Sequence, residues 1–192
     1  MRFLLAVLGL EYERRTVPFA DERPEWHRAV NPVGGIPALI DGDVVLAESN
    51  AILRYLAARE GRSDLLPHDP RERAPIDWVL DTVGTTLRPI CREVDGPAYG
   101  WQRHLGIGSA PARPQDVPGA IAKIAPQLET YGRLIGDDGY ACHGRLTVAD
   151  CAAMPSLWRL LHAGALTGKL RAWAETIAAH PAWAPVAAES GL

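Results

Sequence analysis

The spacing of apolar residues changes along the chain and divides it into two parts. In the first part, residues 2–8 have apolar positions at helical spacing, residues 12–19 are β-prone, and two apolar runs flank the Asp-Gly step within residues 36–47. Two such runs around Asp-Gly indicate a β-hairpin. We therefore predict helix 2–8, strand 12–19, a hairpin, and a helix that opens at Ser49 and stops at Gly61.

From residue 71 onward the pattern is helical throughout. Four predicted helices share apolar positions three or four residues apart, and residues 95–118 between them are rich in Gly and Pro and predict a long loop. The expected core positions are Ile76, Val79, Leu80, Val83, Leu87, Ile90, Ile121, Ile124, Leu128, Tyr131, Leu134, Leu170, Trp173, Ala174 and Ile177, with a further helix from Thr147 to about His162. The prediction is an α/β domain over residues 1–61, a linker over 62–70 and an all-helical domain over 71–192.

Composition narrows the class of protein. The 192 residues are 47% hydrophobic and carry a net charge of -3, without a basic stripe, so nucleic-acid binding has no electrostatic support. No apolar run approaches the length of a membrane span, and residues 2–8 fit an amphipathic helix better than a signal peptide. Three cysteines without a CxxC pair favour a reducing compartment, and we expect a cytoplasmic protein with no membrane or nucleic-acid partner.

Pro37 stands at the head of the first hairpin strand. Proline donates no ladder hydrogen bond, so it is confined to strand starts, edges and bulges. One interpretation is a trans proline that only starts the strand, since about 5–6% of X–Pro bonds in folded proteins are cis. The other is a cis bond that turns the backbone of Ile36 outward, where its N–H and C=O can pair with an extended peptide.

Glu48 and Ser49 stand where the second hairpin strand ends and a helix begins. A structural interpretation makes Ser49 the N-cap and Glu48 a surface acid near the positive helix end. A functional one lets Ser49 and the free N–H groups hold a carboxylate, while Glu48 pairs with an ammonium. A hairpin brings its ends together, so Pro37 would lie beside this pair. Together these features predict a site for a short peptide with a free α-amino acid end.

Two segments carry a resemblance to a known family. Residues 31–57, NPVGGIPALIDGDVVLAESNAILRYLA, resemble the glutathione-site segment of cytosolic glutathione transferases, and residues 145–155, RLTVADCAAMP, resemble a helix start in the second domain of that family. The resemblance covers nearly all of residues 1–185 and implies a thioredoxin-like domain followed by a helical domain. Thr147 and Asp150 would form a structural capping box, with Leu146 as the hydrophobic staple.

The resemblance implies a role for several residues. Ile36 would supply backbone hydrogen bonds to the cysteinyl part of glutathione, with Pro37 cis, and Glu48 and Ser49 would hold the γ-glutamyl end. Relatives often carry Lys or Arg where this chain has Gly35, near the glycyl carboxylate. Either His27 or Arg28 would substitute for that contact, or these two are solvated loop residues.

The family also implies a Tyr, Ser or Cys, in a loop after a first strand, that faces the glutathione sulfur. The thiolate is the nucleophile, and one hydrogen bond to it, worth roughly 1.5–3 kcal/mol, is about enough to lower the thiol pKa by two units. Residues 2–13 resemble the helix after that loop, so the catalytic residue is expected upstream of Met1 and none is assigned within the sequence. Either the protein is longer, or this chain is catalytically crippled.

The remaining candidate chemistry is weaker. Arg88, Arg92, Tyr99, Trp101 and Trp158 are candidates for an electrophile pocket, although core or surface positions explain each equally well. No metal site is expected, because Cys142, His143 and Cys151 fit no zinc spacing.

The first hypothesis is a glutathione transferase that binds glutathione and adds its thiolate to a small hydrophobic electrophile, as a homodimer expected from the family. The alternatives are a non-catalytic glutathione-binding or dimerising module, and a glutathione-dependent dehalogenase or isomerase.

Overall fold

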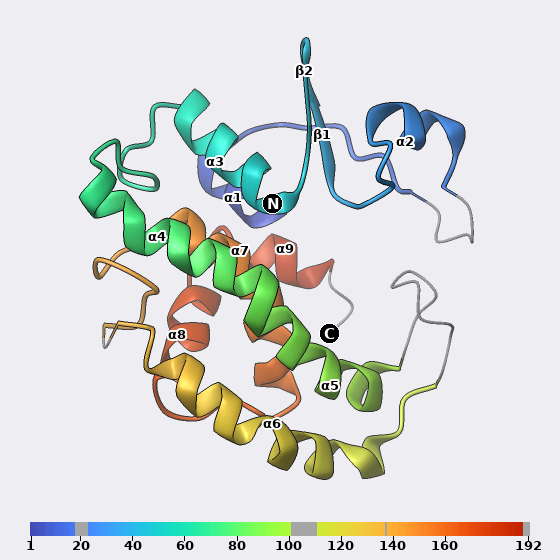
Figure 1. The fold of residues 1–192 in the computed structure, drawn as a ribbon, viewed down its shortest axis with the longest axis vertical. Coiled ribbons are helices and arrows are strands. Elements are labelled where there is room, and N and C mark those ends of the chain that lie inside the picture. Colours follow the sequence, from blue (N-terminus) through green and yellow to red (C-terminus); the bar gives the residue numbers. More distant parts are fainter. Residues whose placement is uncertain (18–22, 101–110, 137, 190–192) are drawn as a thin grey trace.

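The computed structural model describes residues 1–17, 23–100, 111–136 and 138–189. Its N-terminal part contains helix α1 (Arg2–Leu8), helix α2 (Glu25–Val30), strands β1 (Ala38–Asp41) and β2 (Val44–Ala47), and helix α3 (Ser49–Arg59). Its C-terminal part contains α4 (Pro70–Thr82), a π-helical turn (Val83–Leu87), α5 (Arg88–Tyr99), a 3-10 turn (Pro114–Asp116), α6 (Val117–Gly132), α7 (Val148–His162), α8 (Gly168–Ala178) and α9 (Ala184–Ala188). The hairpin projects from one end of the molecule, and α6 lies at the opposite end (Figure 1).

The predicted hairpin is confirmed. Strands β1 and β2 pair antiparallel, with Ala38 opposite Ala47 and Asp41 opposite Val44, so the turn is the two-residue step Gly42–Asp43. Gly42 has φ 61°, a left-handed value that glycine adopts at low cost, and it occupies the first central position of the turn. The register places Pro37 and Glu48, the residues just outside the last pair, at the open end of the hairpin.

The predicted strand at residues 12–19 is wrong over residues 12–17, which are irregular; residues 18 and 19 lie outside the described part of the chain. Among the described residues, the only sheet is the pair β1–β2. A β-prone segment becomes a strand only when a neighbouring strand satisfies its backbone groups. Residues 12–17 have the composition of a strand, but no described strand lies beside them to pair with.

The helical part confirms most of the predicted core. All the predicted apolar positions of α4, the π-helical turn and α5 are buried, and so are the four of α8. The predicted start of the long loop at residue 95 is wrong, because α5 continues to Tyr99 and ends at Gly100 with φ 77°. Val94, Asp95 and Gly96 are buried and α5 packs against α7, so tertiary packing carries the helix through Pro97. The sequence did not predict α9, a helix of five residues.

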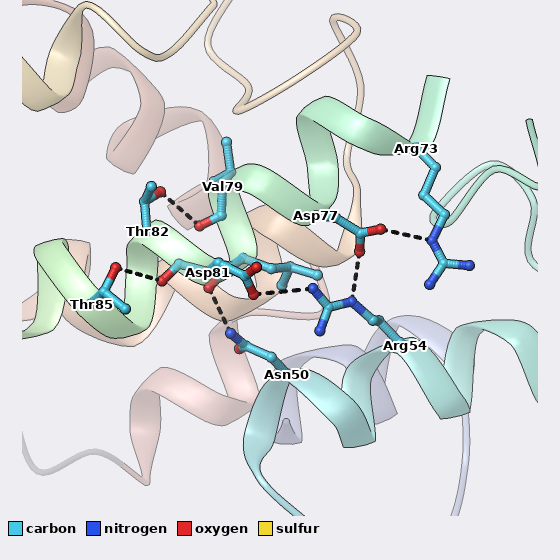
Figure 2. A network of polar contacts seen from close by, with 9 residues as sticks. Asn50, Arg54, Arg73, Asp77, Val79, Asp81, Thr82 and Thr85 are labelled. Atoms are coloured by element: carbon cyan, nitrogen blue, oxygen red, sulfur yellow. Dashed lines mark hydrogen bonds and ion pairs between the residues drawn. The ribbon is translucent and has the colours of Figure 1, made fainter. Parts of the chain in front are cut away.

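A polar network connects α3 to α4, and so connects the N-terminal part to the helical part (Figure 2). The guanidinium of Arg54 donates to Asp77 at 2.6 Å and to Asp81 at 3.3 Å, and Arg73 donates to Asp77 at 3.0 Å. The amide of Asn50 donates to the Leu80 carbonyl at 2.6 Å. Buried apolar side chains from both parts form one continuous cluster. The division into domains 1–61 and 71–192 therefore stays a prediction, because the two parts share a core.

Candidate functional site

The loop before β1 exposes backbone at the open end of the hairpin. The Ile36–Pro37 bond is cis, as the resemblance implies. Ile36 is 44% exposed, and within the described residues neither its N–H nor its C=O makes a hydrogen bond. Buried backbone groups are almost always paired, so an open donor and acceptor at a half-exposed residue can receive a ligand strand.

The side chain of Asn31 holds this loop in place, and sequence reasoning missed it. Asn31 is buried, its amide donates to the Gly35 carbonyl at 2.8 Å, and its oxygen accepts from the Val33 N–H at 3.2 Å. Two bonds from one side chain close a turn over four residues, which is a common function of Asn. The signal for it was the Asn-Pro step that precedes the two glycines.

The start of α3 differs from the prediction by one residue. Ser49 is not the N-cap but the first residue of the helix, and Glu48 occupies the cap position without a capping side-chain bond. Glu48 has φ 68° and ψ 115°, a conformation that costs a residue with a side chain about 1–3 kcal/mol. The Glu48 carbonyl accepts the first helical bond, from Ile52 at 3.0 Å, so the N–H groups of residues 49–51 are free of intrahelical bonds.

Arg88, the first residue of α5, reaches across to this helix start. Its guanidinium donates to the Ser49 hydroxyl at 3.0 Å. Burial lowers the pKa of Arg88, and the nearby Glu48 carboxylate acts in the opposite direction. The serine oxygen accepts from Arg88 and its own O–H stays available as a donor. The helix start therefore offers a hydroxyl donor, free N–H groups and a carboxylate beside a fixed cation.

Of the residues suggested for an electrophile pocket, the structure places Trp158 on the wall of a pocket. A pocket of about 370 Å³ lies between the N-terminal end of α1, Pro37 and the helices α7 and α9, and Trp158 lines it. Arg92 is exposed and is not among the residues that line it. Tyr99 is not among them either, and its hydroxyl donates to the Arg159 carbonyl at 2.6 Å. Trp101 lies outside the described residues.

His27 and Arg28 fall on α2 and have different surroundings. His27 is 2% exposed, so the interpretation of a solvated loop residue is wrong for it, whereas Arg28 is exposed. Neither ring nitrogen of His27 has a hydrogen-bond partner among the described residues. The contact to a glycyl carboxylate that was suggested for these two residues stays a prediction.

The capping residues of α7 have the predicted geometry. Thr147 is the N-cap, and its backbone N–H and hydroxyl donate to one oxygen of Asp150 at 2.7 and 2.9 Å. The other oxygen of Asp150 accepts from the Ala141 N–H at 2.8 Å and the Trp173 indole at 2.7 Å. This fully buried carboxylate ties the helix start to the preceding loop and to α8, which is a structural role.

The three cysteines are free, buried and poorly suited to act as nucleophiles. Burial raises the pKa of Cys91 and of Cys142 to about 12, and it raises the pKa of Cys151 as well. A thiol must ionise to attack, and these thiols stay protonated near neutral pH. Within the described residues, no cluster of three or more His, Cys, Asp or Glu side chains could hold a metal ion, and no helix is long and apolar enough to cross a bilayer.

The sequence is similar to known proteins over most of its length. Residues 1–58 match the family model of the glutathione S-transferase N-terminal domain. Glutathione S-transferase 3 of Zea mays is 32% identical over 91% of this chain and 81% of its own length. Maleylacetoacetate isomerase of Pseudomonas aeruginosa is 29% identical over 95% of this chain and 87% of its own length.

A solved glutathione S-transferase structure is similar to this chain in fold as well. The theta class glutathione S-transferase of Xanthomonas axonopodis pv. citri, a structure with glutathione bound, superposes with a TM-score of 0.76 at 25% identity, over 94% of this chain and 86% of that one. These likenesses bear out the predicted fold class, a thioredoxin-like domain followed by a helical domain. With a relative this similar over most of both sequences, the chain belongs to the glutathione S-transferase family.

Proposed function

We propose that this chain binds glutathione at the open end of the hairpin and presents its sulfur to an electrophile in the adjacent pocket. One observation carries the proposal: the backbone of Ile36, which makes no hydrogen bond within the described residues, lies at the same end of the hairpin as Glu48 and Ser49. Glutathione contains both a peptide backbone and a free α-amino acid end, which are the two features that these groups recognise.

Each group has a defined partner in the proposal. The N–H and C=O of Ile36 pair with the cysteinyl part, as an added strand does. Ser49 and the free N–H groups of α3 bind the γ-glutamyl carboxylate, because a helix N-terminus attracts anions. Glu48 pairs with the γ-glutamyl ammonium. We assign no catalytic residue among the described side chains, since the buried thiols are unsuited to the task.

The reaction we propose is the addition of the glutathione thiolate to a small hydrophobic electrophile. The pocket beside Pro37 supports it, because Phe3, Trp158 and Trp183 give that pocket an aromatic lining next to the backbone that we propose pairs with the cysteinyl part. A second candidate is a glutathione-dependent isomerisation, which the likeness to maleylacetoacetate isomerase over 95% of the chain favours. We also propose a cytoplasmic homodimer, on the basis of the family and of three unpaired thiols.

Retention on immobilised glutathione tests binding apart from chemistry. We expect the chain to be retained and to be released by free glutathione but not by a tripeptide that lacks the γ-linkage. Failure to bind the resin, by a chain whose circular dichroism shows it to be folded, would contradict the proposal.

A further inference from the structure

The charged side chains described on the walls of the pocket beside Pro37 are positive. Among the described residues that line it, two carry an ionised side chain, Arg2 from α1 and Arg159 from α7, and none is an Asp or Glu. The side chain of Arg2 is 25% exposed and that of Arg159 is 38% exposed, so neither is enclosed in the core. Pro37 lines the same pocket and directly follows Ile36, so the two cations share a pocket with the backbone proposed to bind the ligand.

The carboxylates that offset these cations are not part of the pocket lining. Glu189 lies 2.5 Å from Arg2 and 2.9 Å from Arg14, so one carboxylate serves two guanidinium groups. Asp95 is buried, lies 3.4 Å from Arg159, and has one oxygen without a partner among the described residues. Three cations thus face two carboxylates, and only cations line the pocket. A group inside the pocket is therefore in a positive field.

Other titratable groups nearby do not reverse this balance. Met1 lines the pocket, and burial lowers the pKa of its amino group, which favours the neutral form. Burial raises the pKa of the Cys91 thiol to about 12, so it stays protonated. Arg88 and Glu48 interact with each other and offset one another, and Arg92 is a further cation near Asp95. Since the whole chain has a net charge of -3, the positive balance is local to this pocket.

A positive field favours the ionised form of a thiol. An ordinary thiol has a pKa near 8.5 and is mostly protonated at neutral pH, and a cation nearby lowers that pKa. A space of about 370 Å³ is about 9 Å across if it is round, so a sulfur inside it lies within about that distance of a charge on the wall. At this range one uncompensated charge changes the pKa by roughly half a unit to one unit in a partly solvated site.

We propose that Arg2 and Arg159 favour the thiolate of glutathione bound at Ile36, through their positive charge and without a hydrogen bond to the sulfur. The thiol proton passes to the solvent, and the sulfur keeps the electron pair that forms its bond to the electrophile. This inference rests on the proposed function, in which the sulfur of glutathione is presented to this pocket. It names residues within this chain that favour the nucleophile, in addition to the group that the resemblance implies upstream of Met1.

A titration of bound glutathione tests the proposal. A thiolate absorbs ultraviolet light more strongly than a thiol, so absorbance against pH gives the thiol pKa of the bound ligand. The full chain is titrated with saturating glutathione between about pH 5 and pH 10, with S-methylglutathione as the blank because it lacks the thiol. We expect a midpoint at least about half a unit below that of free glutathione. A midpoint equal to that of free glutathione, with binding shown by calorimetry, would overturn the proposal.

Variants of opposite charge separate an electrostatic role from a structural one. Arg2→Gln and Arg159→Gln each remove a cation and should raise the midpoint by about half a unit. Glu189→Gln breaks the same contact with Arg2 but removes an anion, so it should lower the midpoint by a similar amount. If the contact served only to hold the chain together, its loss would move the midpoint in the same direction in Arg2→Gln and Glu189→Gln. That result, or no shift in either variant, would overturn the proposal.

The ion pair between Arg171 and Glu175 on α8 supplies the matched controls. Its side chains are exposed, lie 2.7 Å apart and do not line the pocket, so Arg171→Gln and Glu175→Gln should leave the midpoint unchanged. Shifts in these controls as large as those at Arg2 and Glu189 would overturn the assignment. If Arg2→Gln fails to fold, Glu189→Gln decides, and a midpoint that does not fall in it would overturn the proposal.

Calorimetry separates this inference from the proposed function. A chain that binds glutathione but leaves its thiol pKa unchanged refutes this inference alone. A folded chain that does not bind glutathione refutes the proposed function, and this inference with it.

Discussion

The guanidinium of Arg88 donates a hydrogen bond of 3.0 Å to the hydroxyl of Ser49, and so connects the first turn of α5 with the first turn of α3. The contact spans the two parts of the molecule and places a half-buried cation beside Glu48. Since Ser49 can accept this bond and still donate its own proton, Arg88 orients the hydroxyl that we propose holds the γ-glutamyl carboxylate.

Replacing Arg88 tests this orientation. Arg88→Gln removes the charge and lengthens or breaks the bond to Ser49, and we expect the affinity for glutathione to fall by roughly 1 kcal/mol, about fivefold. Calorimetric titration measures the affinity, with Arg133→Gln as a control, because Arg133, the residue just after α6, is exposed and pairs with Glu129. Equal affinity in Arg88→Gln and the wild type would show that the contact only joins the two parts.

Glu48 should reveal a conflict between stability and binding. Its φ of 68° suits glycine and strains a residue with a side chain, so Glu48→Gly should raise the free energy of unfolding by about 1 kcal/mol. The same change removes the carboxylate proposed to pair with the ligand ammonium and should weaken glutathione binding. Urea denaturation and titration measure the two effects; a variant that is less stable and binds equally well would contradict both parts.

Asp150 should be the costliest single carboxylate to remove. Asp150→Ala leaves the Ala141 N–H, the Thr147 N–H and the Trp173 indole buried without an acceptor. We therefore expect the free energy of unfolding to fall by about 3 kcal/mol or more. Thr147→Ala removes only one hydroxyl and should cost about 1 kcal/mol. Denaturant unfolding measures the free energy of unfolding of both variants. A smaller loss of stability in Asp150→Ala than in Thr147→Ala would show that α7 does not depend on the buried carboxylate.

The cysteines predict a pH dependence. With the pKa of Cys91 and Cys142 raised to about 12, roughly one thiol in 10,000 is ionised at pH 8, against about a quarter at the usual pKa near 8.5. The unfolded chain alone ionises as pH rises through about 8.5, so the stability due to protonated thiols is present below that pH and declines above it. A disulfide reagent at pH 8 should label the native protein far more slowly than the urea-unfolded chain. Rapid labelling of the native protein would contradict the burial of these thiols.

The elements predicted best from the sequence are those whose signals are local. The Asp-Gly step fixed the hairpin, the apolar spacing of α4 and α8 identified the buried faces, and the Thr-x-x-Asp pattern located the start of α7. In each case the residues that form the element also provide its capping or turn chemistry, so no distant partner is needed.

The failures involve partners distant in sequence. Residues 12–17 have strand composition but no described neighbour to pair with, and α5 continues through Gly96 and Pro97 because α7 packs against it. Neither fact can be read from a local window.

The candidate site shows the same limit. The sequence placed Pro37 beside Glu48 and Ser49 through hairpin geometry. It could not reveal that Asn31 closes the loop, that Arg88 reaches Ser49 from another helix, or that Trp183 joins Trp158 in one pocket. Those relationships depend on how helices far apart in the chain pack together.

The central claim is that Ser49 and its neighbours bind glutathione, and a calorimetric titration of wild type, Ser49→Ala and Ser49→Thr tests it most directly. Ser63→Ala is the control, because Ser63 is an exposed residue of the linker. We predict saturable binding of glutathione by the wild type and a binding free energy weaker by roughly 1–3 kcal/mol in Ser49→Ala. The affinity should recover in Ser49→Thr and stay unchanged in the control. Absence of binding by the folded wild type, or equal affinity in Ser49→Ala, would contradict the account.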